Sequence, residues 1–101
     1  MPAYMIVLAK ITDREEFIGG YAPAAAALVE KFGGRYLLRA GGATVLEGDL
    51  DENSSVVISE WPDEDAALNF WNSSEYAEVK KLRQNCASCR VTVVEAPSIS
   101  R

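Results

Sequence analysis

Two arginines in a glycine-bracketed stretch are the residues of this chain whose types and spacing best suit chemistry. The stretch reads GGRYLLRAGGATVLEG over residues 33–48 and sets Arg35 and Arg39 four residues apart. In a strand, this spacing places both side chains on one face. Glu47 and Glu60 lie on neighbouring strand-like segments. We therefore expect a partly buried charged patch, in which the arginine forks either bind the carboxylate or enolate of a ligand or pair with the two glutamates.

This patch is compatible with functions of different classes. In the first, Arg39 and Arg35 hold the charge of a small, partly apolar anion. In the second, the protein is a cofactor-free isomerase or monooxygenase-type enzyme, in which Glu47 or Glu60 removes a proton next to a carbonyl while Arg39 stabilises the enolate. A third interpretation is a purely structural dimer without a ligand. Only the enzyme needs a glutamate of raised pKa beside the pocket.

Aromatic side chains offer a wall for such a ligand. Tyr21, Trp71 and Tyr76, together with Tyr4, could line a pocket between a sheet and its helices. Aromatic residues at helical spacing also commonly fill a core. The sequence leaves both interpretations of these rings open.

Histidine is absent from the sequence, and this absence removes several kinds of site. It excludes a Ser-His-Asp or Cys-His nucleophile, a haem held by a proximal histidine, and metal sites that rely on imidazole. Cys86 and Cys89 have the C-x-x-C spacing, but they follow a helical pattern instead of beginning a helix, where the dipole would lower a thiol pKa. We expect structural thiols, no metal and no cofactor; a redox pair or a zinc site shared across a dimer is the alternative.

Length and charge exclude other classes of partner. A chain of 101 residues with 49% apolar content suits one domain, expected over residues 1–96, and the patternless tail at 97–101 is expected to be mobile. The net charge of −5 removes the attraction that binds nucleic acid or an anionic membrane. The apolar run at residues 4–9 is too short for a signal peptide or a membrane span, which favours a cytoplasmic location.

Hydrophobic patterns and capping residues give the order of the elements. The expected segments are a strand at 4–10, a helix from a capping box at 12–15 to Gly33 with a kink near Gly19, a strand from residue 35, a strand at 55–61, a helix capped by Asp63 and, in its continuation, by Ser73, and a strand at 90–95. Strand–helix–strand thus occurs twice, which is typical of a split βαββαβ unit.

The glycine pair Gly41 and Gly42 decides how many strands separate the helices. A tight hairpin there would give three strands and break the twofold pattern. A bend in one strand from 35 to 48 would keep the pattern, because glycine inside a strand often marks a bulge or a corner. We predict the bend, with an extra hairpin standing clear of the sheet as the alternative.

One face of the expected sheet has no helix to cover it, yet its residues are not polar. The segments YMIVLA and SVVIS do not alternate apolar with polar residues, as a solvated antiparallel face would. We therefore expect two copies to pack face to face as a two-fold homodimer.

Three segments of the sequence resemble those of a known family. GGRYLLRAGGATVLEGD at 33–49, VVISEWPDEDAALNFW at 56–71 and NSSEYAEVKKLR at 72–83 are similar to segments of the DUF1330 family. The resemblance implies a ferredoxin-like α+β fold, with an antiparallel sheet, helices on one face, and assembly as a dimeric α/β barrel. Relatives in that superfamily include cofactor-free monooxygenases, muconolactone-type isomerases and haem-degrading enzymes, which use a pocket between sheet and helices. The expected function is a homodimer that binds a small anion in this pocket.

Overall fold

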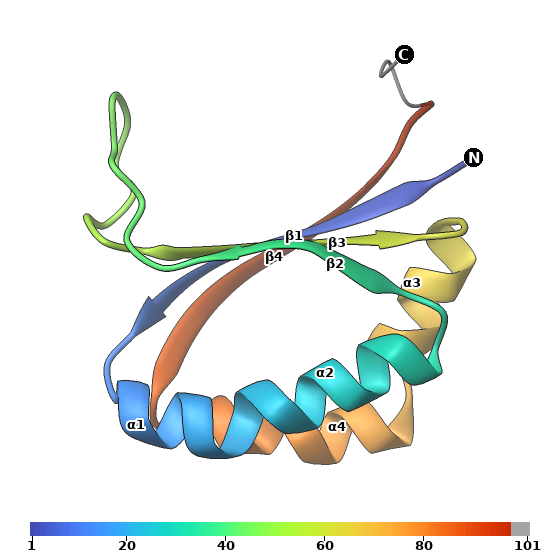
Figure 1. Cartoon of the computed structure of the whole chain (residues 1–101), viewed down its shortest axis with the longest axis horizontal. Coiled ribbons are helices and arrows are strands. Elements are labelled where there is room, and N and C mark those ends of the chain that lie inside the picture. The colour runs from blue at the N-terminus through green and yellow to red at the C-terminus, as the bar shows by residue number, and fades with distance from the viewer. Residues whose placement is uncertain (98–101) are drawn as a thin grey trace.

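The protein is a single layer of four antiparallel strands covered on one face by helices (Figure 1). The computed structural model describes residues 1–97. The elements in chain order are β1 (Ala3–Ile11), α1 (Arg14–Glu16), the π-helical turn η1 (Phe17–Tyr21), α2 (Ala22–Lys31), β2 (Arg35–Ala40), β3 (Ser55–Trp61), α3 (Glu64–Trp71), α4 (Ser74–Lys80), the 3₁₀ turn η2 (Lys81–Arg83) and β4 (Ala87–Glu95). The strand order β2-β3-β1-β4 confirms the predicted ferredoxin-like fold. The expectation of a mobile tail falls mostly outside the described residues.

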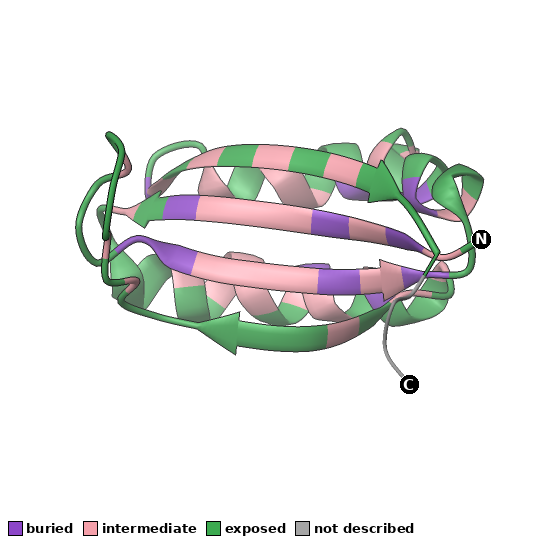
Figure 2. Cartoon of the chain, turned by 90° about the horizontal axis from the view of Figure 1, so that it is seen from above, coloured by how far each residue is buried: buried purple, intermediate pink, exposed green. Residues whose placement is uncertain are grey.

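The two central strands, β1 and β3, are the apolar runs of the sequence. They pair antiparallel with Ile6 opposite Ile58 and Val7 opposite Val57. Figure 2 shows these strands as mostly buried or half-buried, with Lys10 of β1 exposed, whereas the edge strands β2 and β4 carry many exposed residues. A strand with a neighbour on each side and packing on its helix face has little room for polar side chains, which explains its composition.

A buried aromatic cluster joins the sheet to the helices. Trp61 is only 1% exposed, and its ring lies 5.1 Å from that of Phe70, which in turn lies 4.5 Å from that of Tyr76. The indole Nε1 of Trp61 donates to Ser59 Oγ at 2.9 Å, so the buried donor is satisfied. Gly34 makes this packing possible, because a Cβ at that position would lie 2.8 Å from the Trp61 ring.

Side-chain caps fix where the helices begin. Asp63 Oδ1 accepts from Ala66 N–H and Ser73 Oγ accepts from Tyr76 N–H, as predicted. The first helix differs by one residue, since Asp13 caps it through Glu16 N–H in place of the expected box at 12–15. The predicted kink appears as the π-helical turn η1. Within residues 1–97, no helix is long and apolar enough to span a membrane.

Residues 41–54 do not extend the sheet, so the prediction of one bent strand from 35 to 48 is wrong. Strand β2 ends at Ala40, and Gly42 adopts a positive φ of 87°. The segment then leaves the sheet on the side away from the helices (Figure 1). Its residue Leu46 is 94% exposed. Ala43 N–H donates to Ser54 O at 2.8 Å, which closes the base of this loop. The alternative of an excursion clear of the sheet is the better description, and two strands still separate the helices.

A bulge in β2 separates the two arginines. Tyr36 lies opposite Ser59 and Leu38 opposite Ile58, so Leu37 is the extra residue. One inserted residue reverses the alternation beyond it. Arg35 consequently lies on the helix-free face and Arg39 on the helix face, so the predicted sharing of one face is wrong.

Candidate functional site: an arginine-lined cavity between sheet and helices

A cavity of about 400 Å³ opens between the sheet and the first helical segments. The floor comes from side chains on the helix face of all four strands, and the opposite wall comes from η1, α2 and the helical segments after β3. Apolar residues that line it include Met5, Val7, Val57, Val91, Phe17 and Ile18. Ligand pockets of about 300 to 1,000 Å³ suit small molecules, and this cavity falls at the lower end.

Three arginines line this apolar cavity. Arg14 comes from α1, Arg39 from β2 and Arg83 from η2, and no Asp or Glu of the described residues lines the cavity. Among residues 1–97, none of the three forms a salt bridge. The full chain has a net charge of −5, so the cavity has the opposite sign to the protein as a whole. Such a concentration of unpaired guanidinium groups favours an anion.

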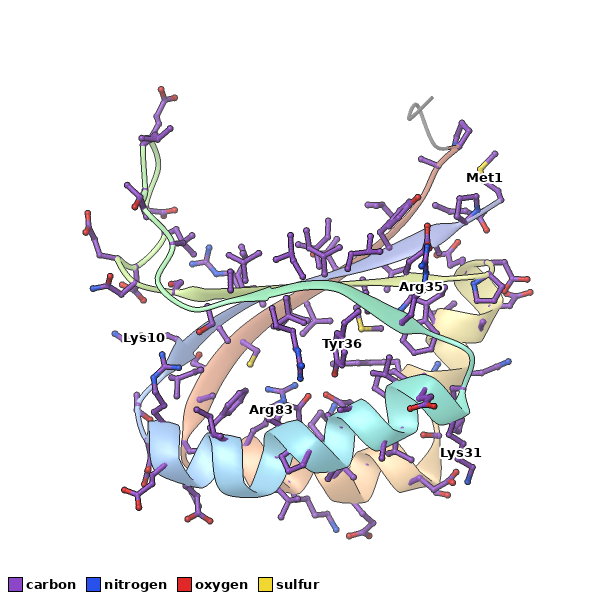
Figure 3. All side chains as sticks on the ribbon, in the orientation of Figure 1. Met1, Lys10, Lys31, Arg35, Tyr36 and Arg83 are labelled. Atoms are coloured by element: carbon purple, nitrogen blue, oxygen red, sulfur yellow. The ribbon has the colours of Figure 1, made fainter. Side chains whose placement is uncertain are left out.

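Arg83 is the deepest of the three. Its side chain extends from the helix layer toward the sheet, into the same space that Tyr36 enters from the sheet (Figure 3). The guanidinium carbon lies 5.7 Å from the centroid of the Tyr21 ring. Its Nε is buried and has no hydrogen-bond partner within the described part of the chain. A buried donor without an acceptor is costly, and a ligand oxygen would satisfy it.

A pair of tyrosine hydroxyls lies beside Arg83. Tyr21 Oη and Tyr76 Oη are 2.6 Å apart, and Tyr76 is only 2% exposed. Burial raises the pKa of Tyr21 well above its ordinary value, and Tyr76 raises it further. Each hydroxyl carries one proton. Because one of the two protons is used in the hydrogen bond between the hydroxyls, the other is available for donation to a further acceptor. The pair therefore offers a neutral donor next to a cation.

Arg39 belongs to the opposite wall. Its guanidinium carbon lies 5.0 Å from the centroid of the Tyr36 ring, a cation–π contact that keeps the group close to the sheet. Burial raises the pKa of Tyr36, although the charge of Arg39 acts against this rise. Arg39 remains exposed, so a ligand that enters from solvent can reach it.

Cys89 also lines the cavity, and Cys86 is buried behind it. Burial raises the pKa of both thiols, so both are protonated at neutral pH. Cys86 Sγ donates to Leu82 O at 3.5 Å, a structural contact. In the described residues, no group of three or more His, Cys, Asp or Glu side chains is arranged to hold a metal. The thiols are best interpreted as packing groups.

The predicted site residues divide between two places. Tyr21, Trp71, Tyr76 and Arg39 all line the cavity. Arg35 does not: it extends away from the helices (Figure 3).

Both predicted glutamates also lie outside the cavity. Arg35 donates from Nε and Nη2 to Glu60 Oε1, at 2.8 and 2.6 Å, on the helix-free face. The hydrogen bond from Arg35 lowers the pKa of Glu60, which is the opposite of what a general base needs. Glu47 is exposed on the loop 41–54. The expected pairing of an arginine with a glutamate across the sheet thus describes Arg35 and Glu60, and does not describe Arg39.

Two cavity arginines were missed by reasoning from the sequence. Arg83 belongs to the short basic cluster Lys80, Lys81 and Arg83 at the end of a helical pattern, and it was not among the expected site residues. Arg14 is hidden inside the capping segment. Neither arginine indicates a binding site from the sequence alone, because basic residues near helix ends are usually solvated.

Fold and cavity together define an α+β protein of the ferredoxin-like class with a basic pocket under its sheet. The sequence matches the model of the family described as "Domain of unknown function (DUF1330)" over residues 2–97, and the chain belongs to that family. No match is found among the curated proteins.

Solved structures share the fold at low sequence identity. The RPA0582 protein of unknown function from Rhodopseudomonas palustris has a TM-score of 0.77 and 22% identity, covering 96% of this chain and 83% of its own. SnoaB, a cofactor-independent oxygenase from Streptomyces nogalater, has a TM-score of 0.68 and 17% identity, covering 96% and 94%. A dimeric ferredoxin-like protein of unknown function from Bacteroides fragilis has a TM-score of 0.62 and 19% identity, covering 94% and 96%. At these identities the likeness extends to the fold alone.

Proposed function

We propose that the protein is a homodimeric binding protein for a small, partly apolar anion, held in the cavity between sheet and helices. The observation that carries this proposal is the set of three arginines, Arg14, Arg39 and Arg83, around an apolar cavity without a lining carboxylate. Arg14 and Arg39 are exposed, but Arg83 is half-buried and its Nε has no hydrogen-bond partner among residues 1–97, which is unfavourable unless an opposite charge joins it. A bound anion supplies that charge.

The homodimer is supported by the helix-free face of the sheet. Ile6, Leu8 and Ile58 lie on this face, and the edge residue Leu38 beside them is 42% exposed. A face-to-face partner would cover these side chains, and a stable interface typically buries about 800 Å² per subunit. The B. fragilis protein of similar fold is dimeric. The exposed Leu46 on the loop that projects from this face would then lie near the second subunit.

The alternative is a cofactor-free isomerase or monooxygenase-type enzyme. The fold shared with the S. nogalater oxygenase favours it. The catalytic assignment to Glu47 or Glu60 has no support from the geometry, because neither glutamate lines the cavity. An enzyme of this type would need a different base, and burial raises the pKa of the cavity residue Tyr21, which keeps its hydroxyl protonated at neutral pH. Anion binding therefore has the stronger support.

Benzoate is a suitable first probe, because it joins an apolar ring to one carboxylate. We expect benzoate titrated by isothermal calorimetry to bind wild-type protein and the Arg90→Gln variant equally. Arg90 is the matched control: it is adjacent in β4 to the cavity residues Cys89 and Val91, and alternation places it on the helix-free face, outside the cavity. Because this face is the proposed dimer interface, light scattering must show that Arg90→Gln keeps the mass of wild type. Binding should weaken about tenfold or more in Arg83→Gln, the loss of one charge-assisted contact of about 1.5 to 3 kcal/mol. Equal affinity for the two variants would remove the cavity as the site.

A further inference from the structure

Two of the cavity guanidiniums are held on separate aromatic rings in opposite walls. Arg39 rests on Tyr36 of β2, with 5.0 Å between its guanidinium carbon and the ring centroid. Arg83 rests on Tyr21 in the helix layer, at 5.7 Å. Figure 3 shows Tyr36 extending from the sheet and Arg83 extending from the helices into the same space. Each ring contact holds its arginine in its own wall, so the cavity has two cationic positions.

One carboxylate can neutralise only one of these positive charges. It has about four lone-pair sites, so both guanidiniums could donate to it, but it carries a single negative charge. Arg14 of α1 adds a third positive charge. It lies close to the end of β2, because its Nη1 would be 3.8 Å from a Cβ at Gly41. A monoanion leaves two positive charges in the cavity, and a dianion leaves one.

We propose that the ligand is a small dianion, with two acidic groups joined by an apolar body, one held at Arg83 and the other at Arg39. This inference rests on the proposed function and specifies its ligand class. The apolar side chains that line the cavity, among them Val57 and Val91, suit an aromatic ring or a short hydrocarbon chain as the body.

The surroundings of Arg83 and Arg39 differ. Beside Arg83, the buried Nε and the Tyr21–Tyr76 hydroxyl pair offer a cation and a neutral donor. An acidic group there would accept from both. Arg39 is exposed, and Arg14 lies close to Gly41 just after β2, so an acidic group held there would sit closer to solvent.

Rigid aromatic diacids and their half-esters test this directly. Terephthalate and isophthalate are compared with their monomethyl esters, which keep the ring and the length but lose one charge. Titration calorimetry at neutral pH and low salt should show at least one diacid binding about tenfold or more tighter than its half-ester. The ratio of the affinities of the diacid and its half-ester should fall toward one in Arg39→Gln and in Arg83→Gln, and should be unchanged in the control Arg90→Gln. Circular dichroism and thermal melting confirm that each variant is folded.

The outcomes separate this inference from the proposed function. If both half-esters bind as tightly as their diacids, the cavity takes a single acidic group, and the dianion is wrong while anion binding stands. If the diacid preference survives both cavity substitutions, it arises elsewhere and the inference is overturned. If benzoate, the diacids and the half-esters all fail to bind, the proposed function itself fails.

Discussion

Replacing Gly34 with alanine tests the packing on which the cavity wall depends. A Cβ at Gly34 would lie 2.8 Å from Cη2 and Cζ2 of Trp61 and 2.9 Å from its Cδ2. The neighbour is the face of a rigid ring that is 1% exposed, so it cannot rotate away as a flexible chain would. Either the strand β2 or the indole must shift.

The expected cost follows from this overlap. Inserting a methyl group into a packed core destabilises by about 1 to 3 kcal/mol. For a domain of about 100 residues, each 1 kcal/mol lowers Tm by roughly 4 °C or more. We expect Gly34→Ala to lower Tm by about 4 to 12 °C in a thermal melt followed by circular dichroism.

A second glycine gives the matched control. Gly20 lies in the helical turn η1, and a Cβ there would meet no atom within 4 Å. Alanine is favoured over glycine in helices by up to about 1 kcal/mol, so Gly20→Ala should leave Tm unchanged or raise it. If Gly34→Ala is as stable as wild type, the close approach of this backbone to Trp61 is wrong, and the cavity wall that Trp61 and Phe70 support must be redrawn.

Three further predictions concern other parts of the molecule. Tyr21→Phe leaves the buried Tyr76 hydroxyl without its partner and should cost about 1 to 3 kcal/mol in a urea titration; an unchanged midpoint would contradict the pair. Ile58→Asp places a charge on the helix-free face and should convert a dimer to a folded monomer by light scattering, whereas an unaffected mass would show that this face is free. Because Arg35 lowers the folded-state pKa of Glu60 below 4.5, the stability from this pair is present above pH 4.5 and is lost as pH falls through the lowered pKa. Glu60→Gln should therefore lose less stability than wild type on acidification, and parallel pH profiles would refute the pairing.

The order of elements was predictable because its signals are local. Continuous apolar runs mark the central strands, and the side chains of Asp63 and Ser73 mark where helices begin. These features depend on neighbours in the sequence, so they survive folding unchanged. The resemblance to the family gave the same topology independently.

The site was predicted only in part, and the bulge explains why. A single extra residue at Leu37 places Arg35 and Arg39 on opposite faces, yet nothing in RYLLRA marks it, since no glycine is present there. The extra residue is fixed by how β2 pairs with β3. Once the alternation was misjudged, Arg35 and Glu60 were both placed beside the expected pocket, although they pair on the helix-free face.

The contribution of Arg83 required the tertiary structure for a different reason. The residue lies in the 3₁₀ turn η2 that follows α4, and side chains in a 3₁₀ turn follow a different spacing from those of an α-helix. Sequence spacing alone cannot give that direction. The path of the loop 41–54 could not be read from the sequence either. The glycines at its start predict a bend within a strand, but Gly42 adopts a positive φ and the chain leaves the sheet there.

Anion binding at Arg83 is tested most directly by the NMR signal of its own Nε–Hε group. This donor is buried and without a hydrogen-bond partner among residues 1–97, so a ligand oxygen would change its environment more than that of an exposed arginine. Addition of terephthalate or benzoate should shift this signal and leave that of Arg90 unchanged. If both probes leave the Arg83 signal where it was, at concentrations that saturate any binding seen by calorimetry, the cavity is not the anion site.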